Sequence, residues 1–231
     1  MPDVLSARDI VEPVLLTLSL ALIVTALLVV IATPLAWWLC RSKAPWKEAV
    51  AAVAALPLVL PPTVLGFYLL LAFGPFGPGG ALAGLWGART LAFSFEGLIV
   101  ASLIYSLPFM VQPLRNAFEA FGNEPLEAAA SLGASSWQTF LRIAVPLARP
   151  GYLTGAVLTF AHTVGEFGVV LMIGGNIPGK TRVLSVAIFN YVERGLWENA
   201  HILSAGMVIF AFVAITATML IDRRIGQLSR S

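Results

Sequence analysis

Long apolar runs alternate with short polar stretches along the chain, and five of the runs are long enough to cross a lipid bilayer as helices. A transmembrane helix needs about 20 predominantly apolar residues. The five runs cover residues 14–39, 49–73, 97–114, 152–173 and 200–221. The first run carries no charged residue, which argues against a buried helix of a large soluble core. The pattern predicts an all-α integral membrane protein with about five transmembrane helices, in a single domain over residues 1–231.

Composition agrees that most of the chain lies in lipid. Hydrophobic residues make up 58% of the sequence and charged residues 11%, and the mean hydropathy is +0.88. A soluble domain averages about 25% charged residues, so a soluble fold of this composition would leave too much apolar surface in water. The net charge is only +2 and no basic stripe appears, which excludes a nucleic-acid-binding surface. Cys40 is the only cysteine, so we expect neither an internal disulfide nor a cysteine-based metal site.

The loops between the runs differ in positive charge, and this asymmetry predicts the orientation. Nine of the 14 Lys and Arg residues lie in one set of loops and five in the other. The first set contains Arg41, Lys43, Lys47, Arg115, Arg142, Arg149, Arg223, Arg224 and Arg230. The second set contains Arg8, Arg89, Lys180, Arg182 and Arg194. Because cytoplasmic loops carry the excess of positive charge, we expect the N-terminus outside and the C-terminus in the cytoplasm.

Proline interrupts the second apolar run at Pro57, Pro61 and Pro62. Proline lacks the backbone N–H and clashes with the preceding turn, so we expect the helix to kink or unwind near Pro61. Inside a bilayer, freed carbonyls are tolerated only against protein or a water-filled cavity, which makes this break a candidate part of a translocation pathway. Thr63 follows the break, where its hydroxyl either donates to an anion or bonds its own backbone in a simple packing kink. In the Gly- and Pro-rich loop at residues 74–90 we expect no regular helix.

The fourth run contains two ionisable residues, His162 and Glu166, in the sequence FAHTVGEFG. Four residues apart on one helix, they share a face, and ionisable groups inside a membrane usually face a bundle interior or a cavity. Three interpretations are open: a metal-ligand pair, an intramembrane acid–base pair, and a structural or gating interface. Gly165 and Gly168 favour the third, because small residues allow close helix packing. No P-loop or His-Glu-x-x-His motif occurs, so nucleotide energy, if used, must come from another chain.

Residues 123–146 are more polar than the apolar runs and predict a helix, a sharp turn and a second helix at the cytoplasmic face. Asn123 is placed to cap the first helix, and Glu127 lies near its positive end. Gly133 fits the C′ position that ends this helix, and Ser135 or Ser136 caps the second. An apolar stripe on the second helix consists of Trp137, Phe140, Leu141 and Ala144. The element is either an interfacial connector or a rigid helix suited to a groove on a partner.

The same stretch resembles the cytoplasmic signature of the permease subunits of ABC importers. That signature reads Glu-Ala-Ala, three residues, Gly, nine residues, Ile, one residue, Leu and Pro. The matching residues are Glu127, Ala128, Ala129, Gly133, Ile143 and Pro146. Val145 stands where the family usually has Leu. The resemblance implies that this segment is the coupling helix, which sits in a groove of the ATPase subunit.

Nearly the whole chain is similar to the molybdate permease family, through stretches such as LPLVLPPTVLGFYLL from residue 56 and ARPGYLTGAVLTFAHTVGEFG from residue 148. The family typically reads Phe-Ala-Arg where this chain has Phe-Ala-His, so position 162 lacks a fixed positive charge. The resemblance implies a type I importer permease of the inner membrane that carries molybdate or tungstate, with a sulfate- or thiosulfate-type oxyanion as the alternative. The candidate pathway and gate residues are Pro61, Pro62, Thr63, His162, Gly165 and Glu166.

The resemblance also implies a set of partners. These are a second copy of the chain in a homodimer, two copies of a cytoplasmic ABC ATPase, and a periplasmic or extracellular oxyanion-binding protein. ATP and Mg would be bound by the ATPase, so the permease itself needs no cofactor and is not an enzyme. The competing class is an intramembrane enzyme that uses His162 and Glu166.

Overall fold

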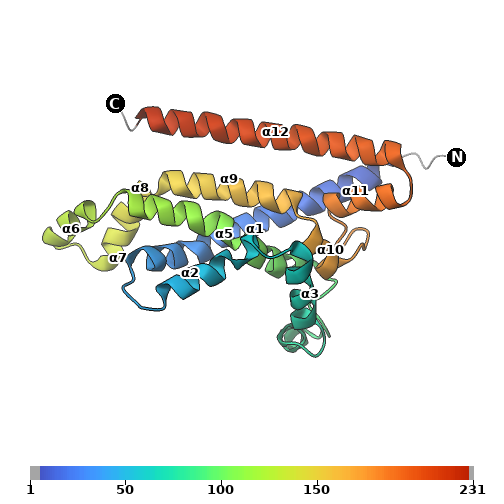
Figure 1. The fold of residues 1–231 in the computed structure, drawn as a ribbon, viewed down its shortest axis with the longest axis horizontal. Helices are drawn as coiled ribbons and strands as arrows, with labels where there is room; N and C mark the ends of the chain where they lie inside the picture. The colour runs from blue at the N-terminus through green and yellow to red at the C-terminus, as the bar shows by residue number, and fades with distance from the viewer. Residues whose placement is uncertain (1–5, 229–231) are drawn as a thin grey trace.

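The computed structural model describes residues 6–228 and is a bundle of helices (Figure 1). Within that range there is no strand, and the predicted all-α class is confirmed. Three helices, α1 (Ala7–Arg41), α5 (Phe95–Ala120) and α9 (Arg149–Gly165), pack pairwise against one another. Their common core is apolar and includes the fully buried Leu28 and Leu114.

Three helices are individually long and apolar enough to span a membrane, namely Arg8–Arg41, Phe95–Ala120 and Trp197–Thr216. Two bent pairs pass the same test together. They are Lys47–Leu58 with Pro62–Phe73, bent by 108°, and Arg149–Gly165 with Gly168–Gly174, bent by 60°. If each bent pair forms one span, the chain crosses five times, which is the number that the apolar runs predict.

The first helix extends beyond the apolar run 14–39 at both ends. Its start is fixed by Ser6, whose side chain accepts from the Asp9 backbone while the Asp9 carboxylate accepts from the Ser6 backbone. Such a capping box satisfies two free N–H groups at the helix start. Hydropathy therefore locates the part of α1 that contacts lipid, whereas capping residues decide where the helix begins.

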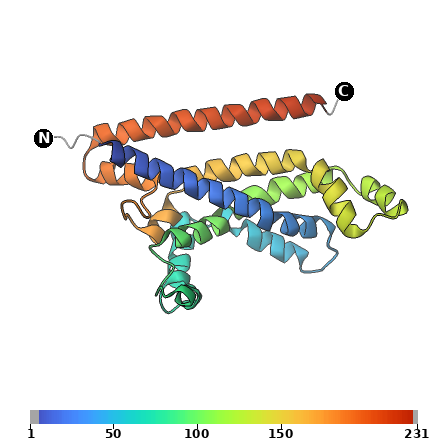
Figure 2. The ribbon, with the colours of Figure 1, turned by 180° about the vertical axis from the view of Figure 1, so that it is seen from behind.

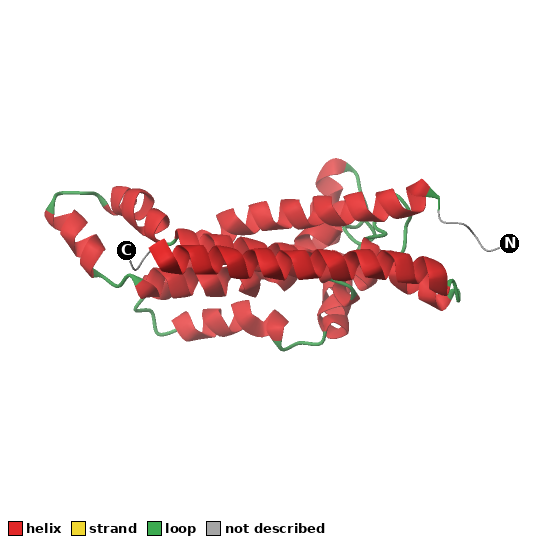
Figure 3. Cartoon of the chain, turned by 90° about the horizontal axis from the view of Figure 1, so that it is seen from above, coloured by secondary structure: helices red, strands yellow, loops and turns green. Residues whose placement is uncertain are grey.

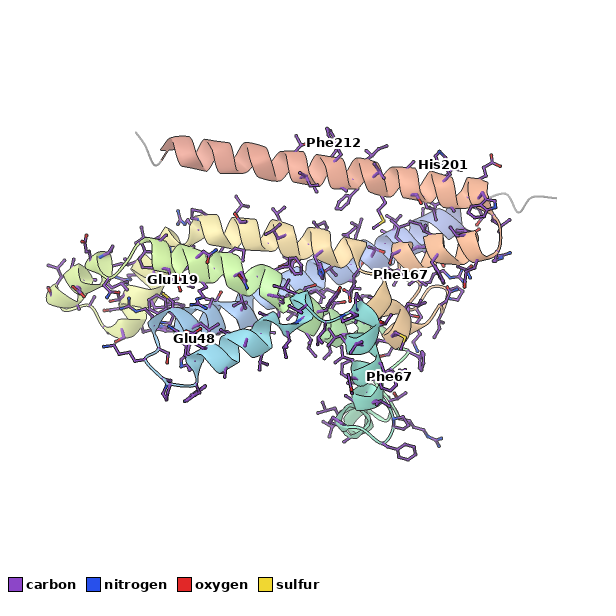
Figure 4. All side chains as sticks on the ribbon, in the orientation of Figure 1. Glu48, Phe67, Glu119, Phe167, His201 and Phe212 are labelled. Atoms are coloured by element: carbon purple, nitrogen blue, oxygen red, sulfur yellow. The ribbon has the colours of Figure 1, made fainter. Side chains whose placement is uncertain are left out.

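The second apolar run is divided into α2 (Lys47–Ala55), a short 3₁₀ turn and α3 (Pro62–Phe73). The sharp bend directs α3 away from the bundle, and Phe67 marks its position (Figure 4). The predicted interruption near Pro61 is confirmed, because Pro61 is the residue that precedes the first turn of α3. The predicted span over 49–73 is thus formed by two helices that meet at this break.

The loop at 74–90 differs from its prediction, because it contains the short helix α4 (Pro78–Ala83) and a 3₁₀ turn, η2 (Gly84–Trp86). Pro78 suits the first helical turn, where its missing N–H costs nothing. Gly79 allows the loop to pack tightly on α3, since a Cβ there would lie 2.7 Å from the Phe73 Cα. The glycines thus allow close packing of this loop and do not prevent helix formation.

The fourth apolar run is also divided, into α9 and α10 (Gly168–Gly174), and the predicted continuous helix over 152–173 is wrong. A further helix, α11 (Leu184–Glu193), precedes α12 (Trp197–Leu228). Seen from above, α12 runs along the length of the bundle (Figure 3). Its outer side is exposed, as Phe212 shows with 71% of its surface accessible.

The two ends of the molecule carry different elements. The segment between α5 and α9 lies at the same end as the last turns of α12, and the first turns of α1 lie at the opposite end (Figures 1 and 2). Many basic residues of the larger loop set flank the first of these ends: Arg41, Lys43, Lys47, Arg115, Arg142 and Arg149. Arg230, which belongs to the same set, lies outside the described residues.

Candidate functional site

The two helix breaks lie against each other in the middle of the chain's helical bundle. Gly168, the first residue of α10, packs on Pro62, the first residue of α3, so closely that a Cβ at Gly168 would lie 2.7 Å from the Pro62 Cβ. One turn further along, a Cβ at Gly66 would lie 2.8 Å from the Met172 Cβ. The glycines at these two contacts therefore allow the two broken segments to pack closely.

A pocket of about 500 Å³ lies between these breaks and α5, and we call it the gate pocket. Four residues of its lining have polar or ionisable side chains, namely Thr63, Tyr105, His162 and Glu166, and the candidate Gly165 also lines it. The Thr63 side chain is exposed and forms no hydrogen bond with any described residue. Among the described residues that line the pocket there is no Lys or Arg.

Glu166 is the residue at which α9 ends, and three elements meet at it. Its backbone is extended, with φ −65° and ψ 131°, and the side chain is 3% exposed. Ser102 on α5 donates to Oε2 over 2.7 Å, and the Ser185 hydroxyl of α11 donates to the Glu166 carbonyl over 2.5 Å. Oε1 is buried without a partner among the described residues. Glu166 therefore ties the break to both α5 and α11 and keeps one unused acceptor.

His162 lies one turn earlier and also contacts α5. Its ring stacks on Phe109 at a centroid distance of 4.0 Å and packs against Tyr105 at 4.7 Å. Nδ1 lies 2.9 Å from the Ser106 hydroxyl. His162 and Glu166 thus bind two serines that are one turn apart on α5, and no hydrogen bond joins the pair itself.

This arrangement bears on the three interpretations of the His162–Glu166 pair. Within residues 6–228 no three His, Cys, Asp or Glu side chains come together as a metal site would require. Each of the two side chains instead joins α9 to α5, which is the arrangement of a helix interface next to a pocket. The Phe167 side chain follows at the junction of α9 and α10 (Figure 4). The sequence did not predict that the helix ends at Glu166, although the glycines on either side were visible.

The segment between α5 and α9, residues 123–147, consists of α6 (Glu124–Ser131), α7 (Ser136–Thr139), a π turn at Phe140–Ala144 and α8 (Val145–Leu147). We call it the coupling segment. Gly133 has φ +83°, and the Gly133 and Ala134 N–H groups donate to the carbonyls of Ala130 and Ala129. These two bonds form a Schellman motif, so Gly133 ends α6 as predicted.

The second half of the coupling segment begins with a capping box. The Ser135 side chain accepts from the Gln138 N–H over 3.3 Å, and the Gln138 side chain accepts from the Ser135 N–H over 3.0 Å. At the other end, Asn123 occupies the predicted N-cap position but its side chain does not cap the helix. The Asn123 side-chain oxygen accepts instead from the Arg41 guanidinium, which joins the coupling segment to α1.

Not all residues of the signature face outward. Glu127 and Ala128 are exposed on α6, whereas Ala129 is 6% exposed and faces the chain itself. Ile143 and Pro146 are half-buried, and Ile143 packs against the main core. Leu132, which sequence reasoning missed, is 89% exposed beside the Gly133 turn.

Aromatic contacts join the coupling segment to the bundle. Trp37 on α1 contacts Phe118 on α5 and Phe140 in the segment, each at a centroid distance of 5.2 Å. The Arg41 guanidinium lies over the Trp37 ring. The segment thus contacts α1 directly and continues into α9.

Comparison with known proteins agrees with this architecture. A family described as "Binding-protein-dependent transport system inner membrane component" matches residues 28–230. The Molybdenum transport system permease protein ModB of Azotobacter vinelandii is 59% identical over 213 residues, which cover 92% of this chain and 94% of that protein. The ModB protein of Escherichia coli (strain K12) is 35% identical over 215 residues, 91% of this chain and 93% of that protein.

Among solved structures, a chain of a bacterial alginate ABC transporter in complex with alginate pentasaccharide-bound periplasmic protein matches with a TM-score of 0.76. It is 17% identical, and the match covers 95% of this chain and 80% of that chain, so this likeness concerns the fold alone. The expected resemblance to importer permeases is confirmed by the family match. This multi-pass membrane protein belongs to the family of binding-protein-dependent transport system inner membrane components.

Proposed function

We propose that this chain is the permease subunit of an ATP-driven importer and that its cargo is molybdate. The observation that carries the proposal is the 59% identity to the Azotobacter vinelandii molybdenum permease over 94% of that protein. Tungstate is a second cargo on the same reasoning, because it is a tetrahedral dianion of closely similar shape.

The gate pocket suits such a cargo. Hydroxyl groups of Thr63 and Tyr105 line it, and among the described lining residues no Lys or Arg supplies a fixed positive charge. A dianion that meets neutral hydroxyl donors beside the largely buried Glu166 carboxyl group is attracted only weakly, which favours passage over retention. The pathway roles of Pro61, Pro62 and Gly165 follow from their place at the two breaks and remain part of the proposal.

The coupling segment supplies the connection to an energy source. It joins the end of α5 to the start of α9, and these two helices carry Ser102, Tyr105, His162 and Glu166 at the gate pocket. A force on Glu127 and Leu132 therefore reaches the gate along two helices that are hydrogen-bonded to each other. We propose that a cytoplasmic ATPase exerts this force when ATP closes it, and that hydrolysis restores the starting state.

The proposed assembly contains two copies of this chain, two ATPase subunits that bind ATP and Mg, and an oxyanion-binding protein outside. In this assembly the coupling segment and the C-terminus face the cytoplasm and the N-terminus faces outward. The basic residues that flank the coupling-segment end support this orientation.

The test is uptake of radiolabelled molybdate, tungstate and sulfate into vesicles that contain this chain, its ATPase and its binding protein. We expect ATP-dependent uptake of molybdate that tungstate inhibits and that sulfate at equal concentration does not. Equal uptake of sulfate would replace the proposed cargo by the sulfate-type alternative. Uptake without ATP would indicate a passive channel, and an ATPase-independent activity that Glu166→Gln abolishes would indicate an enzyme.

A further inference from the structure

An apolar groove runs along the side of the bundle at the end that carries the coupling segment. Its volume is about 830 Å³, within the range of about 300–1,000 Å³ typical of sites that hold small molecules. The walls come from three elements: Val30 and Pro34 on α1, Trp137 and Leu141 in the coupling segment, and Arg149 and Leu153 on α9. Figure 2 shows α1 in front of α9 on this side of the molecule.

The groove offers apolar surface to its surroundings. Val30 is 70% exposed, Trp137 67% and Leu141 46%. The one hydroxyl on its α1 wall, that of Thr33, donates to the Val29 carbonyl of its own helix over 2.5 Å. This wall therefore presents no free hydroxyl donor and suits a hydrocarbon chain.

One end of the groove is different because it carries a cation. Arg149 is the first residue of α9, is exposed, and forms no ion pair or side-chain hydrogen bond with any described residue. From Arg149 the groove continues along α9 to Ala156, about 10 Å deeper at 1.5 Å per residue. Trp137 lies at the rim, in the position where tryptophan rings mark the boundary between lipid headgroups and hydrocarbon.

We propose that this groove binds one anionic phospholipid of the leaflet on the coupling-segment side. The lipid phosphate pairs with the Arg149 guanidinium, and an acyl chain lies between α1 and α9 against Val30 and Leu153. Charge complementarity favours this occupant, because basic pockets between transmembrane helices at the cytoplasmic face bind anionic headgroups. The deep part of the groove lies along two membrane-spanning helices, at a depth that a soluble partner does not reach.

A lipid bound in this groove positions α9 relative to the coupling segment. Two of the groove's three walls belong to α9 and the coupling segment, which we expect to move together, so a bound lipid fills the space between them. The inference does not depend on the cargo, because the groove shares no lining residue with the gate pocket.

Native mass spectrometry of the full-length chain in complex with its ATPase tests the proposal. Phosphatidylglycerol and phosphatidylcholine with identical acyl chains are added to delipidated complex. We expect one phosphatidylglycerol per permease chain and about fivefold weaker retention of phosphatidylcholine, the change expected from one basic residue near an anionic lipid. Arg149→Gln should remove this preference, and Arg142→Gln, which changes an exposed arginine outside the groove, should retain it.

A second variant tests the acyl-chain part of the site. Val30→Trp fills the groove and should weaken retention of both lipids, whereas Val208→Trp, on the exposed side of α12, should weaken neither. Thermal unfolding of each variant checks that the fold is intact. Equal retention of the two lipids by the unmodified complex, or equal loss in Arg149→Gln and Arg142→Gln, would overturn the proposal.

Discussion

The gate pocket and the coupling segment both depend on interrupted helices, but the interruptions are stabilised in different ways. In the coupling segment the helix ends are satisfied locally, by the Gly133 turn and the Ser135–Gln138 capping box. At the gate the end of α9 is satisfied by distant residues, Ser102 on α5 and Ser185 on α11. The first region therefore projects as a self-contained unit, and the second is held together only by the assembled bundle.

This difference predicts which property of the protein a substitution in each region alters. Substitutions in the coupling segment should alter communication with a partner and leave the bundle intact, because the exposed face of α6 has few contacts within the chain. Substitutions at the gate should alter stability and the passage of cargo together. Four experiments test the contrast, in order of decreasing expected effect.

We expect the largest effect when the charge and polarity of the outward face of α6 are reversed. Glu127→Arg combined with Leu132→Asp places a wrong charge and a polar group on the surface that we propose docks on the ATPase. Because one hot-spot residue at the centre of an interface contributes about 2 kcal/mol or more, we expect ATP-driven molybdate uptake to fall by about 30-fold or more. Glu193→Arg, an equal charge change on α11 at the other end, is the control. Normal uptake by the double variant would contradict the proposal that this surface docks on the ATPase.

The next effect concerns stability at the gate. Glu166→Ala leaves the buried Ser102 hydroxyl without its acceptor, and we expect the free energy of unfolding to fall by about 1–3 kcal/mol. Glu166→Gln retains an acceptor and should cost less, and Glu127→Ala on the exposed face should cost about 0.5 kcal/mol or less. Denaturant titration in lipid nanodiscs measures all three. An equal cost for the Ala and Gln variants at position 166 would show that the Ser102 bond does not stabilise the break.

A smaller and local effect is expected at Gly133. No atom lies within 4 Å of a Cβ built there, so the cost of Gly133→Ala comes from φ +83° alone, about 1–2 kcal/mol. Hydrogen exchange in α6 should accelerate while exchange in α5 is unchanged, and Gly133→Asn should behave more like the parent. Accelerated exchange that spread to the α9–α10 break would contradict the self-contained character of the coupling segment.

The smallest effect is expected at Thr63. Thr63→Val removes one hydroxyl from the gate pocket and keeps the side-chain shape. A single hydrogen bond is worth about 0.5–1.5 kcal/mol, so uptake should slow by about two- to tenfold. Thr63→Ser should restore it. Unchanged uptake by Thr63→Val would indicate that Thr63 contributes to packing and not to the passage of cargo.

The same contrast explains what the sequence predicts well. The coupling segment was located with its turn and second cap because caps and glycine turns are set by residues within a few positions of each other. The break near Pro61 was visible for the same reason, since proline acts on its own helix. The exposure of Leu132 and the inward direction of Ala129 were not visible, because they depend on how α6 packs on α7.

The end of α9 at Glu166 shows where local signals fail. No proline stands there, and the pattern FAHTVGEFG reads as one continuous helix with its two ionisable residues on a shared face. The helix ends because Ser102 and Ser185, 64 and 19 residues away, bind the side chain and the backbone of Glu166. Partners that distant are not specified by any spacing within the apolar run.

The most direct test of the link between the two regions is the accessibility of position 63 to a membrane-impermeant thiol reagent. Cys40 is the only cysteine, so Thr63→Cys in a Cys40→Ser background reports on the gate pocket alone. In vesicles that contain the ATPase, we expect labelling from the outside to rise when ATP is bound and trapped. Adding Glu127→Arg and Leu132→Asp should abolish that rise. Labelling that rises with ATP in both proteins alike would contradict the account.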